Sequence, residues 1–316
     1  MELPFALQQA LAAHVAGAKQ GKLLRAAQAL SQRYRARDAQ GAAYIRTPED
    51  ALAYAAARMP ATYGAARQAL SWVLSALPES VAMRTLLDMG AGTGAATWAA
   101  LELLPIESAL CVEASDAMRA LGQGLLGARA AWEKGDLTNW TAKARYDCVT
   151  ACYVINELPE GRQLPAAEAL WRATDGLLLL VEPGTPEGFA LLKRIRERLL
   201  SQGARVLAPC PQEGACPLPE GDWCHFTCRV ARSRLHRLAK QGEAPYEDEK
   251  FAYLALGREA AAPPAARVLR HPYRGKGFLR LEVCASDGLS QRVLTKKDGA
   301  RYQAAKKLQC GDGVSE

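Results

Sequence analysis

The sequence predicts an α/β protein whose central parallel sheet carries helices on both faces. Four apolar segments, at residues 85–87, 109–113, 146–151 and 177–182, have the composition of buried strands. Helical patterns separate them, and this alternation of strand and helix is typical of a parallel sheet. A glycine-rich loop directly follows the first strand and precedes an Ala- and Leu-rich helical segment.

The glycine-rich loop, which contains Gly90, Gly92 and Gly94, predicts a cofactor site. Strand, glycine loop and helix together present backbone N–H groups to a polar ligand, and glycine lets that ligand approach the backbone closely. The dinucleotide motif G-x-G-x-x-G/A is satisfied with Ala95 at its last position. An S-adenosylmethionine site instead has an acid before a G-x-G-x-G loop, and Asp88 supplies it. This acid and the internal position of the loop favour the methyl donor over NAD.

Polar residues after the next strands extend the predicted site. Glu113 ends the second strand about 20 residues after the glycines, where a carboxylate can bind the hydroxyl groups of a ribose. Asp136 lies on a loop and is expected to face the adenine. Asn156 and Glu157 follow the third strand, where a transferred methyl group would meet its acceptor. The same pair also suits the start of a helix after a strand.

Length and composition are those of a globular protein with room for two domains. The chain has 316 residues, of which 49% are hydrophobic and 23% charged. It contains no run of about 18 apolar residues, so we expect no membrane span. Nine cysteines without a secretory signal indicate a reducing compartment. We expect a monomeric, bacterial-type chain located in the cytoplasm.

The N-terminal region, residues 1–80, is expected to be helical. Residues 1–46 are rich in Ala, Arg and Leu with few acids, which also suits a transit peptide. In that case the protein would lie in the mitochondrial matrix. Glu2 and the lack of early basic residues favour an amphipathic helical region instead.

Local signals divide this region into several helices. Apolar spacing predicts one or two helices over residues 3–38. Thr47 as N-cap and Pro48 at the first helical position predict a helix that ends near Pro60. A further helix is expected over residues 62–77, and the whole region is expected to pack on the sheet or to cover the cofactor.

Two domains are predicted to follow. A sheet domain over residues 81–259 contains a Cys-rich insertion at 208–240 and ends with a strand at 251–256. Pro263 and Pro264 lie in the clearest linker of the chain. Beyond it, residues 265–316 are expected to form a small basic domain of short strands with a closing helix near 298–308.

Positive charge is concentrated in three places. The net charge of +7 comes from 40 basic and 33 acidic residues, but residues 265–310 alone carry eleven basic residues and three acids. The other two are a helix at 187–202, with Lys193, Arg194, Arg196 and Arg198, and the run at 229–240, with Arg229, Arg232, Arg234, Arg237 and Lys240. Such clusters predict contacts with RNA phosphates. Tyr273, Phe278 and Tyr302 are candidates for stacking on unpaired bases, although Phe278 also suits a core position.

The nine cysteines fall into different settings. Three of them, Cys111, Cys148 and Cys152, lie in or beside apolar strands and are expected to be core residues. Four others, Cys210, Cys216, Cys224 and Cys228, fall within 19 residues of a Pro-rich segment that cannot build its own core. Converging thiols there predict a metal site, either zinc or an iron–sulfur cluster. Their spacing fits no common zinc finger, and the CxxxCxxC motif of radical enzymes is absent.

Several runs of residues resemble the Rsm22 family of small-ribosomal-subunit proteins. They are 58–63 (RMPATY), 153–158 (YVINEL), 181–189 (VEPGTPEGF), 208–211 (APCP), 216–218 (CPL), 222–226 (DWCHF), 232–236 (RSRLH) and 246–251 (YEDEKF). The resemblance covers nearly the whole chain. It implies a class I (Rossmann-like) methyltransferase fold and association with the small ribosomal subunit during its assembly. It also implies an iron–sulfur cluster, of the 4Fe-4S type, on four cysteines.

The resemblance also implies which cysteines bind the cluster. Three family ligands correspond to Cys210, Cys216 and Cys224. The fourth lies in the C-terminal domain and corresponds to Cys284, with Cys228 as the alternative and zinc as the alternative metal. A cluster bound in this way would join the basic C-terminal domain to the sheet domain across the linker.

Two functions compete on these observations, and a third is weaker. The first is an S-adenosylmethionine-dependent enzyme that methylates ribosomal RNA, although the [DN]-P-P-[YF] loop of many amino-group methylases is missing from 156–159. The second is a non-catalytic assembly factor that keeps the fold and binds rRNA through its basic regions. The third is an NAD-binding oxidoreductase, which leaves the clustered thiols and the basic tail unexplained.

Overall fold

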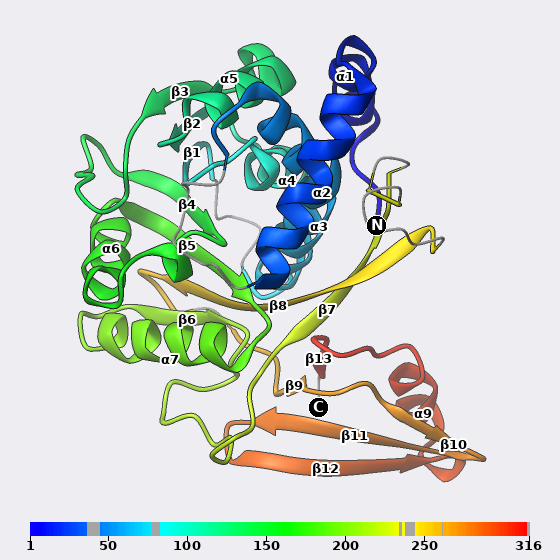
Figure 1. The fold of residues 1–316 in the computed structure, drawn as a ribbon. Coiled ribbons are helices and arrows are strands. Elements are labelled where there is room, and N and C mark those ends of the chain that lie inside the picture. The colour runs from blue at the N-terminus through cyan, green and yellow to red at the C-terminus, as the bar shows by residue number, and fades with distance from the viewer. Residues whose placement is uncertain (37–44, 78–82, 234–235, 238–243, 261, 315–316) are drawn as a thin grey trace.

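The chain forms two sheets joined by extended segments (Figure 1). The computed structural model describes residues 1–316 except 37–44, 78–82, 234–235, 238–243, 261 and 315–316. The first sheet has eight strands and lies between layers of helices, and the second has five strands. None of the helices within the described ranges is long and apolar enough to cross a membrane.

The first sheet contains the predicted parallel strands at its centre. Its order is β3-β2-β1-β4-β5-β8-β6, and β7 also pairs with β8. The parallel strands are β1 (Thr85–Met89), β2 (Ser108–Glu113), β3 (Ala131–Lys134), β4 (Tyr146–Cys152) and β5 (Thr174–Pro183). The remaining strands, β6 (Arg205–Ala208), β7 (Phe226–Ala231) and β8 (Tyr246–Gly257), are antiparallel to their neighbours. The four predicted parallel strands are thus confirmed, and β3 is a fifth parallel strand that the sequence did not indicate.

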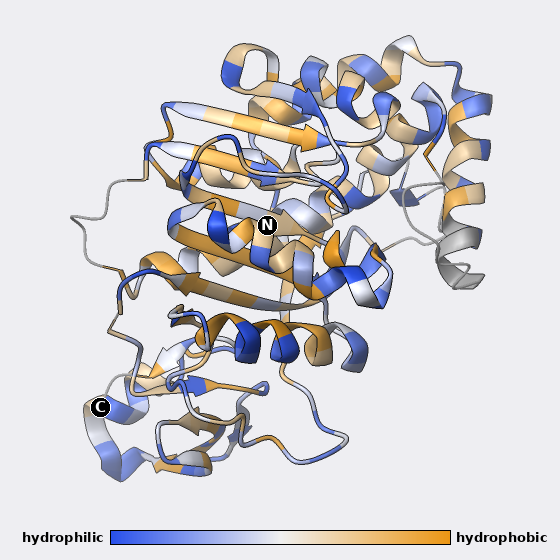
Figure 2. Cartoon of the chain, turned by 90° about the vertical axis from the view of Figure 1, so that its left-hand side faces the viewer, coloured by the Kyte–Doolittle hydropathy of each residue, from blue (hydrophilic) through white to orange (hydrophobic). Residues whose placement is uncertain are grey.

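Helices cover both faces of this sheet, as the sequence predicted. One face carries α1 (Phe5–Gly17), α2 (Gln20–Ala36), α3 (Pro48–Leu74), α4 (Ala95–Leu103) and α5 (Asp116–Leu126). The other carries α6 (Glu160–Arg172) and α7 (Pro186–Leu200). Because successive strand side chains point to opposite faces, Leu177 and Leu179 pack with the first group, whereas Leu178 and Leu180 pack with the second. These doubly buried strands are the most uniformly hydrophobic elements in Figure 2.

Helix α3 differs from the prediction, which ended a helix near Pro60 and began another at residue 62. One helix runs from Pro48 to Leu74, with the predicted N-cap at Thr47, whose side chain accepts the N–H of Asp50 at 3.1 Å. Proline lacks the N–H that would bond the carbonyl four residues earlier. Here that carbonyl, of Ala56, accepts the Ser233 hydroxyl at 2.9 Å instead. A tertiary contact therefore compensates for the break that the local sequence indicated.

The second sheet lies beyond the Pro263-Pro264 segment. It contains β9 (Ala266–Val268), β10 (Tyr273–Gly275), β11 (Phe278–Ala285), β12 (Gly288–Thr295) and β13 (Gly313–Val314). The central strand β11 pairs with β12 on one side and with β10 and β9 on the other. Helix α9 (Gly299–Ala305) packs on one face through Tyr302 and Ala305, so Tyr302 is a core residue rather than an exposed ring.

A double-mutant cycle tests how α3 tolerates its proline. Ser233→Ala should lower the free energy of unfolding by about 1 kcal/mol, because the Ala56 carbonyl then lacks a partner. In a Pro60→Ala background the restored N–H supplies that partner, so the same change should cost less. Urea denaturation of the four proteins measures the coupling. Equal costs in both backgrounds would show that Ser233 acts only as the acceptor for the His236 N–H.

Candidate functional site

A cavity of about 280 Å³ lies at the carboxyl ends of the parallel strands. Strand β1 is flanked by β2 on one side and β4 on the other, so the strand order reverses there. Ligands of open α/β sheets bind outside the strands at this switch point. Among the lining residues are five that the sequence predicted: Gly90, Gly92, Glu113, Asp136 and Glu157.

The glycine loop contributes open backbone to this cavity. Gly92 has φ +57, and a Cβ there would meet only the tip of Met118, at 3.4 Å, so the loop faces free space. Gly90 has φ +66, and a Cβ would lie 2.5 Å from the side chain of Val154. Gly94 is different, because it borders neither this cavity nor the smaller hollow beside it and packs on Leu126. Two of the three predicted glycines therefore lie at the cavity.

Asp88 lies beneath the loop rather than in the main cavity. Its Oδ2 accepts the backbone N–H and hydroxyl of Thr97 at 3.1 and 2.7 Å, and its Oδ1 accepts the Thr150 hydroxyl at 2.8 Å. Thr97 is in the first turn of α4, whose N-cap, Gly94, has no side chain to bond it. Burial raises the pKa of Asp88 to about 6 despite these bonds. The carboxyl thus caps α4 and borders only the smaller hollow.

Glu113 connects the glycine loop to the loop after β2. Its Oε2 accepts the Gly92 N–H at 2.8 Å, and its Oε1 accepts the Ser115 N–H at 2.7 Å. Burial raises the pKa of this carboxyl, and the backbone bonds oppose the shift. Each carboxylate oxygen can accept a second bond, so ribose hydroxyls could still donate to it. Asp136 is exposed, and its Oδ1 accepts the N–H and hydroxyl of Thr138, both at 2.8 Å.

The two predicted catalytic residues, Asn156 and Glu157, differ in their relation to the cavity. Both belong to the short 3-10 helix η3 (Ile155–Glu157), but only Glu157 lines the cavity. Glu157 is exposed at the cavity mouth, yet desolvation by the surrounding wall and the charge of Glu113 raise its pKa to about 7. Asn156 contributes a backbone N–H, which donates to Glu182 Oε1 at 3.3 Å.

Sequence reasoning assigned no role to Tyr153, which also lines the cavity. It has φ +58, a conformation that is strained for a residue with a side chain. Its hydroxyl donates to Glu249 Oε1 at 3.0 Å, and Arg58 binds both oxygens of the same carboxylate. The wall beside Glu157 is therefore fixed by α3 and β8. Tyr54 and Ile45, from the N-terminal region, also border the cavity, as the expectation of a cover anticipated.

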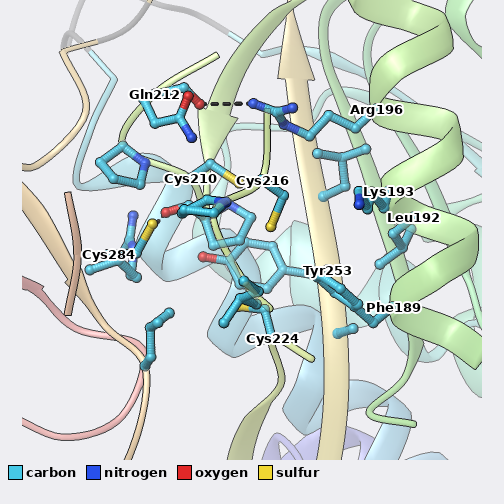
Figure 3. A pocket seen from close by; sticks show the side chains of 18 residues that line it. Phe189, Leu192, Lys193, Arg196, Cys210, Gln212, Cys216, Cys224, Tyr253 and Cys284 are labelled. Atoms are coloured by element: carbon cyan, nitrogen blue, oxygen red, sulfur yellow. Dashed lines mark hydrogen bonds between the residues drawn. The ribbon is translucent and has the colours of Figure 1, made fainter. Parts of the chain in front are cut away.

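A second cavity brings four cysteines together from distant parts of the chain (Figure 3). Cys210 follows β6, Cys216 and Cys224 lie in the loop before β7, and Cys284 is near the end of β11 in the second sheet. Cys228 does not border this cavity. It lies within β7, opposite Glu249 of β8, and its Sγ packs near Gly64.

Two buried arginines also line the cysteine cavity. Arg196 is 5% exposed and Arg267 is 2% exposed. Their acceptors are backbone carbonyl oxygens at 2.9 Å, those of Gln212, Gly214, Pro209 and Gly311. Within the described chain, neither forms an ion pair with a carboxylate, and Arg196 Nε, Arg267 Nη2 and the Tyr253 hydroxyl have no hydrogen-bond partner. Buried charge is costly unless it is compensated, so this cavity suits an anionic occupant.

The four thiols are not arranged around one ion. In the described ranges, no group of three or more His, Cys, Asp or Glu side chains is placed to hold a single metal ion. A tetrahedral zinc site, with Zn–S bonds of about 2.3 Å, would bring its sulfurs within roughly 3.8 Å of each other. Burial raises the pKa of Cys210 and Cys224 and so favours the protonated form of these two thiols.

Many cations that were expected to contact RNA are engaged within the protein. Arg196 is buried in the cysteine cavity, and Arg198 pairs with Glu168. Arg229 pairs with Asp248 and Arg232 with Glu247. Arg234 and Lys240 lie outside the described residues. Several of the predicted RNA contacts outside the second sheet are therefore occupied within the protein.

The strand order, glycine loop and acid after β2 define a Rossmann-like fold of the class I methyltransferase type. The chain belongs to the Rsm22 family, because the family model described as "Mitochondrial small ribosomal subunit Rsm22" matches residues 48–315. This match confirms the resemblance noted in the sequence.

Named relatives and solved structures share parts of the chain. The human "Ribosome assembly protein METTL17, mitochondrial" is 28% identical over 290 residues, which are 83% of this chain and 61% of that protein. "Rsm22-cox11 tandem protein 2, mitochondrial" of Schizosaccharomyces pombe is 24% identical over 218 residues, 54% of this chain and 29% of that protein. The chain thus spans less than two thirds of either relative. Magnesium protoporphyrin IX methyltransferase from Synechocystis, solved with bound S-adenosylhomocysteine, is 15% identical, covers 63% of this chain and 84% of its own, and has a TM-score of 0.41.

Buried Glu182 predicts that the stability of the protein depends on pH. Its Oε1 accepts the N–H groups of Ile155 and Asn156, its Oε2 has no hydrogen-bond partner among the described residues, and burial raises its pKa to about 8. An acid whose folded pKa is raised binds more protons when folded, so its contribution to stability falls as pH rises toward 8.

Glu182→Gln should remove this contribution while keeping the Oε1 acceptor. The difference in unfolding free energy between the variant and the wild type should shift in favour of the variant by about 1.4 kcal/mol for each pH unit between roughly pH 6 and pH 8. Urea denaturation across this range measures it, with exposed Glu107→Gln as the control. Parallel pH profiles for Glu182→Gln and the wild type would mean that Glu182 is ionised at neutral pH.

Proposed function

We propose that this protein binds S-adenosylmethionine at the switch-point cavity and methylates ribosomal RNA during assembly of the small ribosomal subunit. The observation that supports it most is the convergence of the Gly92 backbone, Glu113, Asp136 and Glu157 on one cavity. In this assignment the glycine loop meets the methionine end of the donor. Glu113 accepts the ribose hydroxyls, and Asp136 faces the adenine.

Glu157 is the proposed general base. Methyl transfer forms a bond from a nucleophile of the RNA to the methyl carbon, breaks the carbon–sulfur bond of the donor, and leaves a neutral thioether. The nucleophile loses a proton if it carries one, and a carboxylate with a pKa of about 7 is suited to accept it at neutral pH. Asn156 is not assigned a catalytic role, because it does not line the cavity.

A non-catalytic assembly factor is the second candidate. One observation favours it: of the two predicted catalytic side chains, only Glu157 reaches the cavity. Such a protein would bind the donor, or keep only the pocket, and would contact rRNA through its basic second sheet. The named relatives are described as a ribosome assembly protein and as mitochondrial proteins. They give no support to the expected cytoplasmic location, and the mitochondrial matrix is the location consistent with them.

We also propose an iron–sulfur cluster in the cysteine cavity, bound by Cys210, Cys216, Cys224 and Cys284. The residues present fit such a group. Four thiols border one cavity together with two buried guanidinium groups, for which the described residues supply carbonyl acceptors but no carboxylate. A cluster held by four thiolates is anionic and would compensate these charges. When bound, it would supply a covalent connection between the loop after β6 and β11, and it could respond to oxidation.

Calorimetry with S-adenosylmethionine tests the donor site. The wild type should bind the donor, and Glu113→Ala should weaken binding about ten-fold or more, because the ribose hydroxyls lose a charged acceptor. Gly92→Arg should abolish binding by filling the cavity. The matched control for Glu113→Ala is Glu107→Ala, because Glu107 directly precedes the other end of β2. The matched control for Gly92→Arg is Gly161→Arg, because a side chain at Gly161 meets open space. No heat of binding with the wild type would contradict the proposal. If the donor binds, transfer of labelled methyl to immature small subunits separates the enzyme from the assembly factor.

Metal analysis of protein purified without oxygen tests the cluster. About four irons per chain are expected, with the visible absorbance of a 4Fe-4S cluster. Cys284→Ser and Cys224→Ser should lose both signals. Cys228→Ser should keep them, because this equally buried thiol lies outside the cavity. One zinc per chain without iron, or loss of iron only in Cys228→Ser, would contradict the assignment.

A further inference from the structure

The two faces of the second sheet are covered differently. Side chains alternate along β11, and Leu279, Leu281 and Val283 face the core that includes Tyr302 of α9. The opposite face, here named the outer face, carries Tyr273, Gly275, Phe278, Arg280, Glu282, Gln291, Val293 and Thr295, which pair across β10, β11 and β12. Toward the cysteine cavity this face ends in the buried Arg267 and Cys284. Its other end is open to solvent.

Aromatic side chains lie on the open part of the outer face. Tyr273 is 54% exposed, and neighbouring Val293 is 55% exposed. The Phe278 ring lies over Gly275, where a Cβ would be only 2.2 Å from it. The centroids of the Tyr273 and Phe278 rings are 5.8 Å apart, and the Arg280 guanidinium is 4.9 Å from the Tyr273 centroid. Glycine at 275 therefore makes room for an aromatic pair on the surface of the sheet.

Positive charge surrounds this aromatic pair. Lys276 is exposed in the turn between β10 and β11, and the exposed Lys296 passes close to the same turn, 3.8 Å from a Cβ placed on Gly277. In the described part of the chain, no ion pair engages these lysines or Arg280. Glu282 is the one acid among the outer-face residues named above. The nearby Asp298 is occupied by the N–H and hydroxyl of Thr295.

We propose that the outer face of the second sheet binds single-stranded RNA, with an unpaired base stacked on Tyr273 and phosphates contacted by Lys276, Arg280 and Lys296. Exposed rings on a sheet surface provide a stacking platform for bases, and nearby cations bind the backbone between them. This inference refines the RNA contact of the proposed function and does not depend on methyl transfer.

The chemistry of the face favours RNA over other macromolecules. The cores of protein–protein interfaces are depleted in lysine, whereas two lysines and an arginine without acidic partners flank the rings here. A duplex would offer phosphates to these cations, but its paired bases are not free to stack on Tyr273. An unpaired strand uses both features.

Binding of a labelled oligoribonucleotide to the full chain tests the platform. The probe is a single strand of about 12 nucleotides with mixed sequence, followed by fluorescence anisotropy at several salt concentrations. Tyr273→Ala should weaken binding about five-fold or more, and Tyr273→Phe should keep it, because the ring is what stacks. The double variant Lys276→Ala and Lys296→Ala should make the plot of log affinity against log salt concentration less steep, by about 1.4 in slope.

Tyr246→Ala is the matched control. Tyr246 is 45% exposed and lies under Arg229 at 4.3 Å, but that arginine is already paired with Asp248. This variant should bind the probe like the wild type. The proposal is overturned if Tyr273→Ala binds normally, if a duplex of the same sequence binds as tightly as the single strand, or if Tyr273→Ala impairs only binding to small-subunit proteins. Donor calorimetry on the same variants should be unchanged, so failure of the platform is distinct from failure of the methyl-donor site.

Discussion

Positive charge is buried where the two sheets meet, and burial of charge is costly unless it is compensated. Arg196 extends from α7 and Arg267 from β9, and both reach the cavity that the four cysteines border. Backbone carbonyl groups satisfy part of their hydrogen bonding but supply no negative charge. An anionic centre held by thiolates would satisfy both groups. It would also explain why a Pro-rich loop without a core of its own lies folded between the sheets.

Strand β8 connects this cavity to the switch-point cavity. Glu249, near its start, binds Tyr153, which lines that cavity, and Arg58. Tyr253, four residues further along the same strand, borders the cysteine cavity. The two candidate sites therefore share a structural element, and β8 also pairs with β5, β6 and β7. The outer face of the second sheet continues from the cysteine cavity through Cys284, which places the proposed RNA platform on the same connected framework.

Local patterns predicted the sheet and much of the site, and tertiary contacts decided the rest. Apolar segments predicted β1, β2, β4 and β5, because strands buried on both faces are uniformly apolar, but not the more exposed β3. The glycine loop predicted the switch-point cavity, because glycine leaves the backbone accessible. The continuity of α3 through Pro60 was not predictable, since Ser233 lies far along the chain. Nor could spacing distinguish Glu157 from Asn156, because the two are adjacent in η3 and only Glu157 lines the cavity. Spacing grouped Cys228 with its neighbours, whereas the fold places Cys284 at the cavity, as family resemblance implied.

We propose that an anionic metal cluster occupies the cysteine cavity and joins the two sheets. Diffraction from crystals grown without oxygen, recorded on both sides of the iron absorption edge, tests it most directly. We expect anomalous density from several irons between Cys210, Cys216, Cys224 and Cys284, within reach of Arg196 and Arg267. A cavity that contains no iron, or one zinc ion bound elsewhere in the loop, would contradict it.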